Sequence, residues 1–172
     1  MARDTEVALG SLSKNQQFRF LSICGIDFES ARQAIKLARM QLGQTPMIKG
    51  IVFNAFSELA VVRYSRPFAA SKIVAGKKTR LPSTYLDVLS PVQRALHAKL
   101  YKLRNTTAAH TQAHGRRMQH IRIPGLYGKD PQTISLLRIR CATEAQLSKM
   151  IGMIDALDAE LRKHRDPLAP KV

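Results

Sequence analysis

Apolar residues recur at the spacing of one helix face near the end of the chain, and this pattern constrains the fold more than any other. Thr143 precedes the pattern and Gln146 follows three residues later, as in a capping box at a helix start. The apolar positions are Leu147, Met150, Ile151, Ile154, Leu157 and Leu161. A stripe of this length is covered either by the rest of the chain or by a second subunit. The pattern predicts a long helix, most simply one packed into an intramolecular core.

The first part of the chain predicts one helix after a polar tail. Residues 1–13 are polar and aperiodic, which predicts a flexible N-terminal tail. Residues 18–26 are apolar but short, and fit either a strand or the entry to a helix. Asp27 has the chemistry of an N-cap, and apolar residues at helical spacing follow it as far as Gly43, which fits a helix end.

A second helix is expected from Pro46 to about Tyr64. Its apolar face is broad and few charges interrupt it, so it is interpreted as the central buried helix of the domain. Glu58 lies inside this run. Its carboxylate is expected either at the surface or, less simply, buried in an ion pair with an arginine such as Arg66.

A third helix starts at Ser90, where Pro91 and Gln93 complete a capping pattern. Residues 115–140 differ, because Gly and Pro break any helix and short alternating stretches favour a β-hairpin or another extended excursion. The chain is therefore predicted to be all-α: a four- to five-helix up-down bundle with a short basic loop or β-hairpin before the last helix. One helical domain is expected over 14–166, with a short C-terminal tail at 167–172.

The charge balance predicts a polyanionic or acidic partner. The chain has 172 residues, with 28 Lys and Arg against 12 Asp and Glu, a formal charge of +16. The excess of positive charge could serve solubility alone, but an electrostatic field of this size also attracts nucleic acid. No apolar run approaches the roughly 20 residues that cross a bilayer, so no membrane partner is expected. The N-terminus lacks a signal-peptide pattern and the two cysteines suit reduced thiols, which together predict a cytoplasmic protein.

The end of the third helix carries the candidate chemistry. His97, Tyr101 and Arg104 share one helix face, and His110 follows six residues after Arg104. On an unbroken helix Arg104 and His110 would diverge by roughly 120° with about 9 Å of rise. Two arrangements could still bring them to one phosphate. The helix could break near Thr106, with Asn105 bonding local backbone, or two protomers could share the site across a twofold axis.

The stretch Leu103-Arg104-Asn105, followed after four residues by His110-Thr111, resembles the signature of the HEPN (higher eukaryotes and prokaryotes nucleotide-binding) superfamily. That signature is an Arg, usually followed by a polar residue, with a His a few residues later. His97 and the stretch Tyr64 to Phe68 are similar to recurrent features of small bacterial proteins of this kind. The match covers roughly residues 90–112.

The resemblance implies a metal-independent endoribonuclease of toxin or defence type that acts on RNA as a homodimer. In that interpretation His110 is the general base or acid, Arg104 stabilises the phosphorane, and Asn105 orients a group or binds a phosphate oxygen. The residues expected to contact nucleic acid are His97, Tyr101, His114, Arg116, Arg117 and Arg66.

Two other functions stay open. The same bundle could bind nucleic acid without cleaving it, or its basic surface could dock an acidic antitoxin or regulatory protein. His110 and His114 have a spacing that can bind zinc on a helix, but no further ligand completes the set. No metal and no cofactor are therefore expected.

Overall fold

Helix α1 (Lys14–Met40) begins well before the residue predicted to cap it. The computed structural model describes residues 6–40, 46–74, 77–108, 117–123, 132–138 and 142–170. Ser13 and Gln16 form a capping box: the Gln16 amide donates to Ser13 Oγ at 3.4 Å, and the Ser13 amide donates to Gln16 Oε1 at 3.1 Å. The prediction of Asp27 as the N-cap is wrong, because Asp27 lies in the middle of α1 and is 2% exposed. Residues 18–26 are helical, and Phe20 and Cys24 are buried in the core.

The other three long helices begin where the sequence predicts. Helix α2 spans Pro46–Ser65, α3 spans Pro91–Ala108 and α4 spans Glu144–Arg165. Ser90 and Gln93 bond each other reciprocally at the start of α3, with distances of 2.9 and 3.3 Å. Thr143 and Gln146 form the predicted capping box of α4. Capping patterns therefore located the starts of α3 and α4, and Pro46 located the start of α2.

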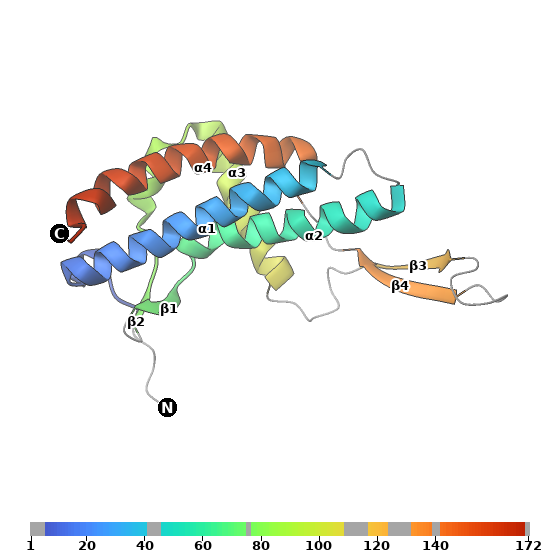
Figure 1. The fold of residues 1–172 in the computed structure, drawn as a ribbon, viewed down its shortest axis with the longest axis horizontal. Helices are drawn as coiled ribbons and strands as arrows, with labels where there is room; N and C mark the ends of the chain where they lie inside the picture. The colour runs from blue at the N-terminus through green and yellow to red at the C-terminus, as the bar shows by residue number, and fades with distance from the viewer. Residues whose placement is uncertain are drawn as a thin grey trace, which may run out of the picture.

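The helices form the predicted bundle (Figure 1). Helices α1, α2 and α4 lie side by side, with α1 packed against both of the others, and α3 crosses them and packs mainly against α2. Large buried side chains from all four helices meet in one core, including Phe28, Tyr64, Leu100, Leu147 and Ile154. The α4 stripe is buried inside the chain, so intramolecular packing is confirmed for it. No helix in the described ranges combines the length and the apolar content needed to span a membrane.

The basic segment after α2 is more structured than the sequence indicates. It contains a 3₁₀ turn η3 (Arg66–Phe68), the antiparallel strands β1 (Ser71–Val74) and β2 (Lys77–Thr79), and a second 3₁₀ helix η4 (Ser83–Val88).

The predicted N-terminal tail is packed onto the domain from residue 6 onward. The amide of Val7 donates to the carbonyl oxygen of Lys78 at 2.9 Å, and Thr79 Oγ1 donates to the Val7 carbonyl oxygen at 3.1 Å. Leu9, in the 3₁₀ turn η1 (Leu9–Ser11), and Leu12 are both buried. The folded domain therefore includes these apolar anchors, which the polar composition of 1–13 concealed. At the other end a 3₁₀ turn, η6 (Asp166–Leu168), follows α4, and Leu168 packs against the core.

The β-hairpin predicted before the last helix is confirmed. Strand β3 (Arg117–Ile123) pairs with β4 (Gln132–Arg138) in antiparallel register, from Arg117 opposite Arg138 to Ile123 opposite Gln132. Short alternations of apolar and polar residues, such as 121–123 in β3 and 134–136 in β4, are typical of strands.

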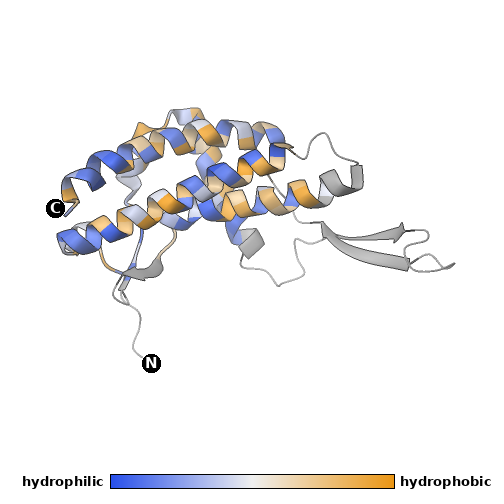
Figure 2. Ribbon diagram, in the orientation of Figure 1, coloured by the Kyte–Doolittle hydropathy of each residue, from blue (hydrophilic) through white to orange (hydrophobic). Residues whose placement is uncertain are grey.

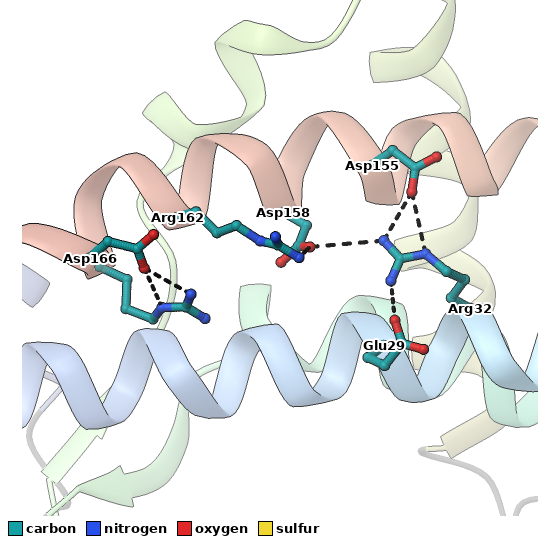
Figure 3. Close-up of polar contacts among 7 residues, drawn as sticks. Glu29, Arg32, Asp155, Asp158, Arg162 and Asp166 are labelled. Carbon is teal, nitrogen blue, oxygen red and sulfur yellow. Dashed lines mark hydrogen bonds and ion pairs between the residues drawn. The ribbon is translucent and has the colours of Figure 1, made fainter. Parts of the chain in front are cut away.

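Ion pairs link α1 to α4 on the outside of the bundle (Figure 3). Arg32 on α1 donates to Asp155 Oδ1 at 2.9 Å and also bonds Glu29. Further along α4, Arg162 bonds Asp158 Oδ2 at 2.8 Å. These pairs are mostly exposed, so each stabilises the fold by less than about 1 kcal/mol. Several of the 12 acidic residues of the chain therefore lie on the side formed by α1 and α4.

Helix α2 is not the fully buried helix that its sequence predicts. Ser57, Ala60, Val61, Tyr64 and Ser65 are buried, yet Leu59 is 42% exposed and Ala55 is exposed. Figure 2 shows apolar residues along much of the described part of α2. Glu58 is half-buried, and the carboxylate paired with Arg66 is Asp27 instead. Among the described residues, part of the apolar surface of α2, at Ala55 and Leu59, is therefore exposed.

Candidate nucleic-acid interface

His97 and Tyr64 form a hydrogen-bonded pair between α3 and α2. The Tyr64 hydroxyl lies 2.9 Å from His97 Nδ1, and Tyr64 is fully buried. Burial raises the pKa of Tyr64 and lowers the pKa of His97, so both groups are neutral near pH 7. We infer that the phenol donates to Nδ1, which leaves the ring proton of His97 on Nε2. The pair fixes the rotation of α3 against α2.

Aromatic rings extend this contact on both sides of His97. The ring of Phe68 meets His97 edge-on with centroids 4.7 Å apart, and Tyr101 stacks on His97 at 6.2 Å. Tyr64 and Phe68 also pack against Phe28 of α1, each at 6.2 Å. The predicted shared face of His97 and Tyr101 is confirmed by their stacking. Tyr101 is half-buried, which leaves part of its ring as a surface on which a base could stack.

Arg104 lies one turn beyond Tyr101, toward the end of α3. Its Nη1 donates to Asn105 Oδ1 at 3.0 Å, and its Nε is buried with no hydrogen-bond partner among the described residues. A guanidinium has five donors in a fixed fork, so the contact with Asn105 leaves most of them for a ligand. A buried donor without a partner is costly, and a phosphate oxygen is the type of acceptor that would satisfy it.

Helix α3 continues through Thr106 and Thr107 to Ala108, one residue past the pair near which the sequence allows it to end. His110, His114 and Arg116 lie outside the described residues, as does the zinc spacing considered for the two histidines. Arg117 opens β3, and its side chain lies outside the described part as well. Convergence of Arg104 and His110 stays a prediction.

A buried carboxylate on α1 holds two arginines at the end of α2. Arg63 Nη1 lies 3.0 Å and Arg66 Nη1 lies 3.4 Å from the same atom, Asp27 Oδ1. Both guanidiniums remain partly exposed, so each keeps donors that face solvent. Asp27 was singled out from the sequence, but as a helix cap and not as an interior ion-pair partner. It lies within an apolar stripe, and Arg63 and Arg66 lie three residues apart at the end of the next helix and just after it. These two features together could have predicted a buried ion pair.

Replacement of Asp27 by alanine is expected to lower the free energy of unfolding by about 2 kcal/mol, because the variant lacks two charge-assisted hydrogen bonds to a buried carboxylate. Asp155→Ala is the matched control, since Asp155 also pairs with an arginine but is 57% exposed. It should cost less than about 1 kcal/mol. Urea denaturation measures both variants. Equal losses would contradict the structural role assigned to Asp27.

Cations dominate the part of the chain that surrounds these side chains. Between Glu58 and Glu144 the only acidic residues are Asp87 and Asp130. On α3, Lys99 and Lys102 are exposed and Arg104 is half-buried, and within the described residues no carboxylate forms an ion pair with any of the three. By contrast, Arg32 of α1 and Arg162 and Arg165 of α4 pair with acids (Figure 3). The positive charge of Lys99, Lys102 and Arg104 is therefore not compensated by the described carboxylates.

No family of known proteins, no curated protein and no solved structure matches this chain.

Proposed function

We propose that the protein binds RNA on the basic surface around α3 and residues 63–80, and that it cleaves the RNA without a metal ion, with two copies as the active unit. One observation carries the proposal: Arg104 follows Tyr101 by three residues on α3, and its buried Nε has no partner among the described residues. A fixed cation with free donors, next to an aromatic ring, suits a phosphate and its neighbouring base.

The proposed reaction uses the ribose itself as the nucleophile. The 2′-hydroxyl attacks the adjacent phosphorus, the bond to the 5′-oxygen breaks, and a 2′,3′-cyclic phosphate forms. His110 takes the proton from the 2′-hydroxyl or gives one to the leaving 5′-oxygen. Arg104 stabilises the negative charge that builds on the phosphorane, and Asn105 holds the guanidinium in place. Only RNA carries this hydroxyl, so the chemistry selects RNA over DNA.

RNA affinity is expected to fall when Arg66 is replaced by alanine, because Arg66 is partly exposed at the edge of the basic surface. For a single strand, the slope of log affinity against log salt concentration should decrease by about 0.7 for each phosphate that the variant no longer neutralises. The control is Arg162→Ala on α4, because Arg162 is also exposed and also pairs with an aspartate, Asp158 at 2.8 Å, but lies away from the proposed RNA surface. Fluorescence anisotropy with a labelled RNA at several salt concentrations measures both variants. An unchanged slope in the Arg66 variant, or an equal loss in the control, would place RNA on another surface.

The same binding titration, together with a cleavage assay, distinguishes RNA cleavage from RNA binding alone and from binding of an acidic protein. Salt-sensitive binding without cleavage would indicate a non-catalytic nucleic-acid-binding domain. Neither binding nor cleavage would favour an acidic protein as the partner of the basic surface, and would overturn the proposal.

A further inference from the structure

The face formed by α1 and α2 carries most of the exposed apolar surface of the described chain. Six large apolar side chains are exposed in the described residues, and four of them lie here: Ile26, Leu37 and Met40 on α1 and Leu59 on α2. Ile26 and Met40 are 64% and 70% exposed. Such concentration is unlike the single scattered apolar residues normal for a protein surface, and it marks a contact site.

Three of these four side chains, Ile26, Leu37 and Leu59, line one open pocket of about 420 Å³ between α1 and α2. Ala34 completes its apolar lining, and Glu29 and Arg63 are among the polar residues that line it. Along α1, Ile26, Gln33, Leu37 and Met40 are exposed and Ser30 is half-buried, and these five positions are separated by alternating steps of four and three residues. This is the spacing of a helix that packs along another helix. We propose that this face, defined by Ile26, Ser30, Gln33, Leu37, Met40 and Leu59, binds the same face of a second copy of the chain.

Charge favours a second copy over a polyanion. Glu29 and Lys36 are seven residues apart on one flank of the α1 stripe, so they lie on the same side of the helix, and Lys36 is exposed. A twofold axis that crosses the stripe near Gln33 runs the two α1 helices antiparallel. Ile26 of one copy then meets Met40 of the other, and Glu29 lies near Lys36 of the other copy. A self-complementary pattern of this kind is what a twofold interface requires.

The size of the face and its surroundings also suit this partner. A helix of 20 residues is about 30 Å long, and two neighbouring helices offer on the order of 600 Å² on one side. This approaches the roughly 800 Å² that each partner buries in a stable complex. The face is also not uniformly basic, because both Glu29 and Arg63 line the pocket. The acidic side chain limits the repulsion between two chains of charge +16.

An interface on this face would hold together the two copies of the proposed active unit, and its formation does not depend on RNA cleavage.

Sedimentation velocity on the full chain tests for the dimer, with nucleic acid removed and about 0.3 M salt added to screen the repulsion between the two basic chains. The wild type should sediment with twice the 19.2 kDa mass of one chain. Ile26→Glu and Leu59→Glu should each raise the dissociation constant of the dimer by about 100-fold or more, because each change places two buried charges in one interface.

Val92→Glu is the matched control, since Val92 is 70% exposed but lies at the start of α3. Circular dichroism checks that each variant is folded, and two variants guard against a fold defect in one. A monomeric wild type would overturn the inference. So would a dimer that survives both substitutions, or one that Val92→Glu weakens equally. RNA binding is absent from this assay, so the failure of the proposed function would leave these results unchanged.

Discussion

Replacement of Arg104 by alanine is expected to lower the rate of RNA cleavage in excess EDTA by about 100- to 1000-fold, the usual effect of removing one group that stabilises transition-state charge. Arg104 is expected to act in the transition state more than in binding, so RNA affinity should fall much less than the rate. Stability should hardly change, because the substitution removes a buried Nε that has no partner in the described residues. Gel assays with a labelled RNA measure the rate, and thermal unfolding measures stability.

Lys102→Ala is the control for Arg104. Lys102 is exposed on the same helix, two residues away, and it carries the same charge. Its removal should weaken RNA binding slightly with little effect on the rate of the bound complex. His110→Ala should resemble the Arg104 variant, and the double variant should cost far less than the two single losses added together, because the two residues act in one step. Cleavage that survives in the double variant would refute the proposed site.

Replacement of Tyr64 by alanine is expected to give the largest loss of stability, about 3–5 kcal/mol, as for other buried aromatic residues. The side chain is fully buried and packs against Phe28, Phe68 and His97. For a chain of this size the loss corresponds to a decrease in Tm on the order of 10 °C. A loss below about 1 kcal/mol would mean that Tyr64 does not hold α2 and α3 together.

Tyr64→Phe separates the hydroxyl from the ring. It keeps the packing but leaves His97 Nδ1 without its 2.9 Å partner, so stability should fall by about 1 kcal/mol. Tyr101→Phe is the control, because Tyr101 also contacts His97 through its ring but does not make this bond, and its effect should be within about 0.5 kcal/mol. If the two phenylalanine variants are equally stable, the Tyr64–His97 bond does not contribute to the fold.

Much of the fold could be predicted because its signals are local. The capping boxes at Ser90 and Thr143 and the apolar stripe of α4 depend on residues three or four apart, and the structure confirms them. The start of α1 was missed because an aspartate within an apolar stripe resembles a cap, whereas here it pairs with Arg63 and Arg66 from another part of the fold. The packing of the N-terminal segment was missed for a similar reason, since Val7 bonds Lys78 and Thr79, far along the chain.

In the candidate site, too, contacts within one helix could be predicted from the sequence, and contacts between helices could not. Helical periodicity placed His97, Tyr101 and Arg104 on one face, and the stacking of His97 on Tyr101 agrees with it. The contact between His97 and Tyr64 joins residues on two helices, so no spacing within one helix could predict it. The exposure of Leu59 could not be predicted either. An apolar residue on a helix has the same sequence pattern whether it packs in the core of its own chain or against another chain.

The most direct test of the central claim compares two RNA oligonucleotides of the same sequence, one of them with 2′-deoxyribose throughout, each incubated with the wild-type protein in excess EDTA. If RNA is cleaved by attack of its own 2′-hydroxyl, the ribose strand will be cut and its products will end in 2′,3′-cyclic phosphate, visible by mass spectrometry, while the deoxy strand stays intact. Equal cleavage of both strands, or loss of ribose cleavage when EDTA is added, would contradict the account.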